Sequence, residues 1–119
     1  MKTTTTDPYQ DIRDAVRALC AEFPDAYHRK IDSARGYPEA FVDALTQAGW
    51  LAAMIPTDYG GSGLGLTEAS VVMEEINRCG GNAGACHGQM YNMGTLLRHG
   101  SDAQKQLYLP RIASGEWRL

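Results

Sequence analysis

The chain has 119 residues, of which 44% are hydrophobic and 21% are charged, and its formal net charge is −3. This length suits one domain with its own core, and the composition excludes an intrinsically disordered chain. The mild acidity without any run of Lys or Arg argues against nucleic acid as a partner, and the longest wholly apolar stretch, residues 50–55, is too short to span a membrane.

The N-terminal part of the chain contains two predicted helices. Residues 1–6 lack the apolar segment of a secretory signal, so we expect a flexible tail. Asp7 can cap a first helix, which carries apolar residues at helical spacing and ends at Pro24. A polar stretch follows, and a second helix runs from Pro38 to Gly49, a typical helix stop. The apolar positions of the two helices are Ile12, Val16, Leu19, Cys20 and Phe23, and Phe41, Leu45 and Ala48.

The middle of the chain has a different pattern. The apolar run over residues 50–55 is short and continuous, and a glycine-rich stretch follows Pro56. We expect an extended segment that crosses the domain and leads into a glycine loop. The loop is similar to a nucleotide-binding fingerprint, but Leu66 stands where the third glycine of that motif belongs. A structural turn is therefore the favoured interpretation over phosphate binding.

Three helical patterns follow the loop. The first two carry apolar residues at helical spacing, and the third opens with a capping box, in which a Ser and a Gln side chain satisfy backbone N–H groups reciprocally. The patterns begin near Thr67, at Asn82 and at Ser101, and they end at Gly80, at Gly100 and at Pro110, where the last helix kinks or stops. The sequence therefore predicts an all-α fold, an orthogonal bundle of about five helices in a single domain over residues 1–119.

Few groups are placed to carry chemistry. Glu74 and Glu75 are adjacent and point about 100° apart on a helix, so a solvated face with a Glu74–Arg78 pair is favoured over an acid and base couple. The Cys and His residues match no zinc-site spacing, and Cys86 and His87 lie on different helix faces, so no metal site is expected. The three cysteines are expected to be packed free thiols in a cytoplasmic protein.

The predicted helix that ends at Gly100 has an unusual second stripe. Gly84, Gly88, Tyr91 and Thr95 fall on one face, with His87 beside them, although each interior Gly costs a helix about 1 kcal/mol relative to Ala. The stripe forms a shallow furrow with a backbone floor and two rings as its wall. It suits close packing of another helix or a slender ligand, and the pattern by itself favours helix packing.

Several motifs give the chain a resemblance to a known family. They are Ile55-Pro56-Thr57-Asp58-Tyr59-Gly60-Gly61-Ser62-Gly63-Leu64-Gly65-Leu66, Glu74-Glu75-Ile76, His99-Gly100-Ser101-Asp102-Ala103-Gln104-Lys105-Gln106-Leu107-Tyr108-Leu109-Pro110 and Ala113-Ser114-Gly115-Glu116. In order and spacing, they resemble the N-terminal helical domain of the acyl-CoA dehydrogenases. The resemblance covers most of the chain and is weakest before Tyr37.

The resemblance implies a longer parent enzyme, in which a β domain that holds much of FAD and a helical C-terminal domain follow. In that family a carboxylate of the C-terminal domain removes the α-proton of an acyl thioester, while the β-hydride passes to the flavin. We therefore expect no catalytic residue in this chain, which lacks those two domains, and no activity of the chain alone. The implied partners are acyl-CoA, an electron-transfer acceptor and further copies of the parent protein in a homo-oligomer.

The resemblance also implies that the helix ending at Gly100 lines the acyl end of the substrate pocket. Together with the furrow, this favours a substrate wall made by Gly84, His87, Gly88 and Tyr91 over helix packing alone. These rings are larger and more polar than the aliphatic lining of medium-chain members, which favours a short, branched or polar acyl group. The predicted function is the N-terminal domain of an FAD-dependent acyl-CoA dehydrogenase that forms a 2,3-enoyl-CoA. The alternative is a stand-alone helical binding or partner module without catalytic activity.

Overall fold

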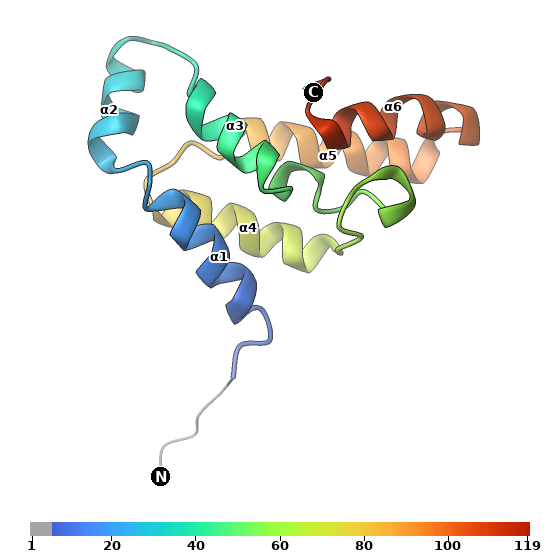
Figure 1. Cartoon of the computed structure of the whole chain (residues 1–119), viewed down its shortest axis with the longest axis horizontal. Coiled ribbons are helices and arrows are strands. Elements are labelled where there is room, and N and C mark those ends of the chain that lie inside the picture. The colour runs from blue at the N-terminus through green and yellow to red at the C-terminus, as the bar shows by residue number, and fades with distance from the viewer. Residues whose placement is uncertain (1–5) are drawn as a thin grey trace.

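The computed structural model describes residues 6–119, so the tail expected over residues 1–6 lies outside them except for its last residue. The described residues form six α-helices and two short 3-10 helices, and none of them lies in a strand. The helices are α1 (Gln10–Cys20), α2 (Asp25–Ser33), α3 (Glu39–Gln47), α4 (Leu66–Arg78), α5 (Gly84–His99) and α6 (Asp102–Ser114), with η1 (Trp50–Ala52) and η2 (Thr57–Tyr59) between α3 and α4 (Figure 1). The all-α prediction is confirmed.

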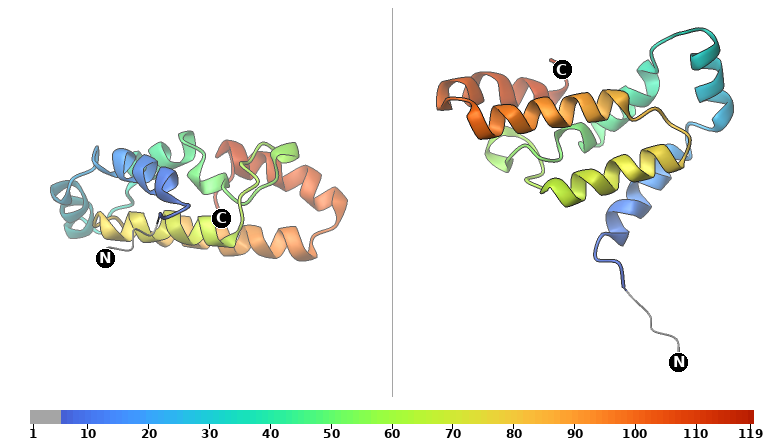
Figure 2. Two further views of the ribbon diagram at one scale, coloured as in Figure 1. Left: turned by 90° about the horizontal axis from the view of Figure 1, so that it is seen from below. Right: turned by 180° about the vertical axis from the view of Figure 1, so that it is seen from behind.

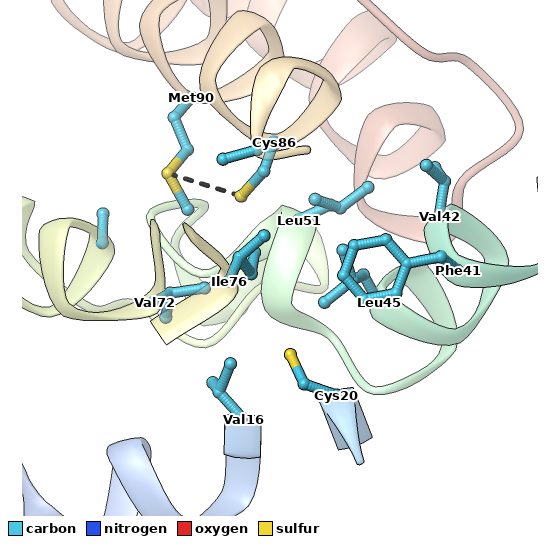
Figure 3. Packing of buried hydrophobic residues seen from close by; sticks show 12 residues of the cluster. Val16, Cys20, Phe41, Val42, Leu45, Leu51, Val72, Ile76, Cys86 and Met90 are labelled. Atoms are coloured by element: carbon cyan, nitrogen blue, oxygen red, sulfur yellow. Dashed lines mark hydrogen bonds between the residues drawn. The ribbon is translucent and has the colours of Figure 1, made fainter. Parts of the chain in front are cut away.

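The helices form two layers, with α4 and α5 on one side and α1, α3 and α6 on the other (Figure 2). The shortest extent of the domain is 19 Å, about the thickness of two packed helices. Two buried clusters fill the space between the layers. The larger contains Val16, Cys20, Phe41, Val42, Leu45, Leu51, Ala69, Val72, Ile76, Ala83, Cys86 and Met90 (Figure 3), and the smaller contains Ala52, Ile55, Met93, Leu109 and Ile112. The predicted apolar stripes of the helices thus lie in or against the core, except that Ala48 at the end of α3 is exposed.

Helix α2 was not expected, because residues 25–33 read as a polar stretch. None of its residues is buried, so it has no apolar stripe that could predict it. The ring of Tyr27 packs against the larger core cluster, and its hydroxyl accepts a hydrogen bond from the backbone N–H of Phe41 at 3.3 Å. Tertiary contacts of this kind stabilise α2, which raises the helix count from about five to six.

The apolar run over residues 50–55 is not extended, which corrects the prediction. Gly49 adopts a left-handed conformation with φ of 85° and leads directly into η1. Leu51, Ala52, Ala53 and Ile55 are buried, while Trp50 and Met54 are partly buried, so most of this short segment lies within the core. A short continuous apolar run indicates that the segment is buried, but it does not distinguish an extended backbone from a helical one.

The predicted helix starts are placed to within two residues. In α6, the backbone N–H of Gln104 donates to the Ser101 hydroxyl at 3.1 Å, and the Gln104 side chain accepts from the Ser101 N–H at 2.8 Å, so the capping box is confirmed. The Asn82 side chain accepts from the N–H of Gly84 at 2.8 Å. Asp7 accepts from the N–H of Tyr9 at 2.8 Å, and α1 begins only after that turn.

Pro110 does not end α6, which continues to Ser114 and stops at Gly115 with φ of 84°. The left-handed glycine, which relieves the steric cost of that backbone conformation, therefore sets the end of this helix. The same device ends α4, where Gly80 has φ of 87°, as the sequence predicts.

Glu75 corrects the prediction of a solvated acidic face on α4. Its side chain is 1% exposed and accepts hydrogen bonds from Arg17 at 2.7 and 3.0 Å and from Arg13 at 3.0 Å. The exposed Glu74 pairs with Arg13 at 3.2 Å, and the described residues contain no Glu74–Arg78 pair. Hydrogen bonds from Arg17, which outweigh the effect of burial, lower the pKa of Glu75 to about 2. A buried carboxylate with two guanidinium partners thus joins α1 to α4.

Candidate functional site

Helix α5 has two contrasting faces. Its inner face carries Cys86, Met90 and Met93, which are buried in the core clusters. The outer face carries the residues predicted from the sequence: Gly84, His87, Tyr91 and Thr95 are exposed and Gly88 is partly buried. The structure therefore brings the four predicted site residues together on one solvent-facing helix surface, which we call the outer face of α5.

Two aromatic rings form a wall on this face. The ring centroids of His87 and Tyr91 are 5.0 Å apart, with the ring planes inclined by 56°, as expected for neighbours one turn apart. The Tyr91 side chain is 58% exposed. The polar side chains of Asn92 and Thr95 bond to their own helix, donating to the carbonyls of Gly88 at 2.8 Å and Tyr91 at 3.0 Å. Their polar groups are thereby partly satisfied within the helix.

An open hollow of about 400 Å³ lies beside Tyr91. Apolar side chains dominate its wall, and Leu66 at its rim is 70% exposed. Tyr91 is the only one of the four predicted residues in the lining, whereas Gly84, His87 and Gly88 lie one to two turns earlier on α5. The lining residues are Met54, Leu64, Leu66, Met90, Tyr91, Gly94, Thr95, Leu97 and Arg98.

Two glycines of α5, Gly88 and Gly94, are not required by contacts within the described chain, whereas a Cβ added at Gly84 would lie 2.9 Å from the side-chain oxygen of Asn82. A Cβ added at Gly88 would come no closer than 3.8 Å to the carbonyl oxygen of Leu119, and one at Gly94 would lie 3.9 Å from the Cε of Met54. Both distances are ordinary contacts. The helices that α5 packs against, α4 and α6, leave this face exposed. Packing of another helix within residues 6–119 therefore does not explain the furrow.

The glycine loop before α4 behaves differently. A Cβ at Gly61 would lie 2.1 Å from the carbonyl oxygen of Ile55, so this glycine is needed for a close approach of backbone. All the backbone N–H groups of residues 60–65 bond within the chain, among them Gly63 to Ile55 and Leu64 to Ala53, each at 2.8 Å. These donors are already used, so the loop is a structural turn, as predicted.

The cysteine and histidine residues of α5 face apart, as expected. Cys86 is 1% exposed with its sulfur 3.9 Å from that of Met90, whereas His87 is exposed. Within residues 6–119, no three potential metal ligands come together. In the same range, no helix has the length and apolar character needed to cross a membrane.

One buried polar residue of α5 escaped the sequence analysis. Gln89 is 2% exposed, its amide nitrogen donates to the carbonyl of Leu51 at 3.4 Å, and its oxygen accepts from the N–H of Leu119 at 3.2 Å. Arg118 pairs with Glu39 and Asp43 of α3. These bonds place Leu119 beside the outer face. The only signal in the sequence is a polar residue next to the apolar stripe of this helix, which does not reveal its partners.

Comparisons with known proteins place these features in a family. The family model described as acyl-CoA dehydrogenase, N-terminal domain, matches residues 6–116. The mitochondrial isovaleryl-CoA dehydrogenase of Pongo abelii is 34% identical in an alignment of 116 positions that covers 94% of this chain and 27% of that protein. The 3-sulfinopropanoyl-CoA desulfinase of Paraburkholderia xenovorans is 27% identical in an alignment of 113 positions that covers 93% of this chain and 29% of that protein.

A solved structure agrees with these matches. The glutaryl-coenzyme A dehydrogenase in its glutaryl-CoA complex superposes with a TM-score of 0.80 at 25% identity, covering 99% of this chain and 31% of that chain. The present chain therefore spans less than a third of the length of the relatives that it matches.

Proposed function

The chain belongs to the acyl-CoA dehydrogenase family, and from this premise we propose that it is the N-terminal domain of an FAD-dependent enzyme that oxidises an acyl-CoA thioester to the 2,3-enoyl-CoA. In this proposal the chain contributes the wall around the acyl end of the substrate. The catalytic carboxylate and the main flavin contacts belong to the β domain and the C-terminal helical domain of the parent protein.

The observation that carries the proposal is the outer face of α5. It presents two glycines, Gly84 and Gly88, which make backbone accessible, and two rings, His87 and Tyr91, which limit the space beside them. No described element covers this face, and an apolar hollow adjoins it. Acyl chains are slender and apolar, so a glycine floor with an apolar neighbourhood suits them.

The two rings favour a short or branched acyl group. Bulky side chains one turn apart on α5 would shorten the space available to the far end of a straight chain. The relative from Pongo abelii is named for isovaleryl-CoA, a short branched substrate, which supports the same substrate class for this protein. Chain length would then be selected by the volume left beside His87 and Tyr91.

The glycine loop at residues 60–65 does not supply a phosphate cradle for FAD. The N–H groups of the glycine loop at residues 60–65 are bonded within the chain, so they are not free to bind a pyrophosphate. The role that we propose for this chain is to bind and orient the acyl group and to exclude water from it. We further propose that the parent works as a homo-oligomer in the cytoplasm and passes electrons to a separate acceptor.

Substrate selectivity tests the proposal. In the intact parent protein, His87→Ala or Tyr91→Ala should shift the ratio of kcat/KM values toward longer acyl chains, with flavin content unchanged. A well-placed group in such a pocket changes selectivity by roughly 10 to 200-fold. The measurement is kcat/KM over a series of acyl-CoA lengths, with the Tm of each variant.

The matched control is His99→Ala. Like His87, His99 is an exposed histidine on α5, but it lies roughly 18 Å from His87 along the helix axis. This variant should leave chain-length selectivity unchanged. A fall in kcat/KM that is equal for every substrate and follows Tm would show that the two rings only stabilise the domain. A native protein with neither bound flavin nor acyl-CoA dehydrogenase activity would favour the stand-alone module instead.

A further inference from the structure

We propose that Cys20 and Cys79 form an oxidisable thiol pair, which closes to a disulfide that joins the end of α1 to the end of α4. The pair lies away from the outer face of α5, and it uses two thiols that the proposed function leaves without a role. The inference therefore stands or falls independently of the acyl-pocket assignment.

The packing of α1 and α4 places these residues together. The two helices pack against each other and run in the same general direction, so that their C-terminal ends are neighbours (Figure 1). The ion pair between Arg17 and Glu75, at 2.7 Å, fixes their register. Cys20 follows Arg17 by three residues and Cys79 follows Glu75 by four, so each cysteine lies one turn further along the same helix face.

Both thiols border one surface hollow of about 340 Å³, together with Arg17, Glu75 and Arg78. Cys20 is 2% exposed, and Cys79 is more accessible, with its thiol donating to the carbonyl of Ile76 at 3.0 Å. Burial, with a smaller contribution from a hydrogen bond to the Cys79 thiol, raises the pKa of Cys20 to about 12. The two thiols therefore share one hollow, with Cys79 packed against the core cluster that contains Cys20, and Cys79 is the more accessible of the two.

Cys86 provides the contrast within the same molecule. It is 1% exposed, its neighbouring sulfur belongs to Met90, and it lies on the opposite side of the core cluster from Cys20 (Figure 3). A thioether cannot form a disulfide, so Cys86 has no oxidation partner among the described residues. The three cysteines thus divide into one potential pair and one structural thiol.

A small-molecule disulfide such as oxidised glutathione can drive the reaction in two exchange steps. The Cys79 thiolate first attacks one glutathione sulfur, which forms a mixed disulfide and releases one glutathione thiol. The Cys20 thiolate then attacks the Cys79 sulfur, which forms the Cys20–Cys79 bond and releases the second glutathione thiol. Two protein thiols are oxidised and one glutathione disulfide is reduced to two thiols, so atoms, electrons and protons balance. Cys79 reacts first because it is the more accessible thiol, whereas Cys20 is buried.

The test uses the full chain with Cys86→Ala, because Cys79 and Cys86 share one tryptic peptide. After incubation with oxidised glutathione, alkylation and digestion under non-reducing conditions, mass spectrometry should find the Cys20 and Cys79 peptides linked within a monomer. The oxidised protein should melt at a higher temperature than the reduced one, by on the order of 10 °C, because the bond closes a long loop. Both changes should reverse with dithiothreitol.

Single substitutions in the same background sharpen the test. Cys20→Ala should retain one glutathione at Cys79, whereas Cys79→Ala should take up none, because Cys20 is buried. Circular dichroism checks that each variant keeps its helix content. The proposal is overturned if a folded protein with both thiols leaves them alkylatable after equilibration, or if the linkage joins two different chains.

Discussion

At the seam between α1 and α4, a carboxylate that is 1% exposed receives hydrogen bonds from two guanidinium groups, whereas the outer face of α5 leaves two rings and a glycine in contact with solvent. Each region contains a residue that is unusual at its position in a helix: a buried carboxylate in α4, and interior glycines in α5. At the seam, the partners of Glu75 lie within the domain. At the outer face of α5, His87 and Tyr91 pack against each other and otherwise face solvent.

This difference distinguishes an unusual residue that stabilises the fold from unusual residues that are available to bind a ligand. A buried charge without its partners is strongly destabilising, so the seam must be completed within the fold. An interior glycine costs a helix about 1 kcal/mol, and an exposed ring costs little, which is less than an unpaired buried charge costs. The outer face can therefore remain open for a ligand or a neighbouring domain. We therefore expect substitutions at the seam to change the free energy of unfolding, and substitutions on the outer face to change it little.

The largest effect is expected for Glu75→Gln. The change removes the charge that pairs with Arg13 and Arg17 and should lower the free energy of unfolding by about 3 kcal/mol, the lower end for a broken buried pair, because both arginines reach solvent. Urea unfolding measures this value. The control Glu74→Gln, whose side chain is 65% exposed, should cost about 1 kcal/mol or less. Equal losses for the two variants would show that burial does not distinguish them.

The seam should also make stability depend on pH. The folded-state pKa of Glu75, about 2, lies below its ordinary value of 4.5, so the unfolded state binds the proton more tightly. The stabilisation is therefore fully present above pH 4.5 and is lost as the pH falls toward 2. Thermal melts across this range should show Tm falling more steeply for the native protein than for Glu75→Gln. Parallel curves would contradict a depressed pKa at this residue.

A smaller effect of opposite sign is expected for Gly88→Ala. The added methyl group meets no atom closer than 3.8 Å, and Ala favours a helix over Gly, so the free energy of unfolding should rise by about 0.5 to 1 kcal/mol. The same variant of the intact parent should lose activity if acyl groups lie against this backbone. Gly61→Ala is the control, since its methyl group would overlap the carbonyl of Ile55 and should destabilise the chain. Destabilisation by Gly88→Ala would instead show that the domain itself requires this glycine.

The smallest effect is expected for Tyr91→Ala in the chain alone. Because the side chain is 58% exposed, the free energy of unfolding should change by about 0.5 kcal/mol or less. Met93→Ala, two residues further and fully buried, should cost about 2 to 5 kcal/mol. Urea unfolding of both variants compares the two faces of one helix. A loss at Tyr91 that approaches the loss at Met93 would remove the distinction between them.

Local patterns in the sequence were sufficient for most of the helices. The apolar spacing of α1, α3, α4 and α5 predicts which sides enter the core, and the Ser101–Gln104 capping box and the stop at Gly80 are found as expected. These features depend on residues within a few positions of one another, so they can be predicted from the local sequence without knowledge of the tertiary structure. The stripe that includes Gly84, Gly88 and Tyr91 lies on one face of α5 for the same reason, while its role as a substrate wall stays a prediction.

Features that depend on distant residues were decided by the tertiary structure. Four features depend on contacts with residues far along the chain. They are the helix α2, which has no buried residue of its own, the 3-10 conformation of residues 50–52, the burial of Glu75, and the contact of Gln89 with Leu119. A polar residue looks the same in a sequence whether it meets water or a guanidinium group 58 positions away. Helical periodicity is a short-range property, and only the packing of α1 on α4 determined that Glu75 would be enclosed and paired.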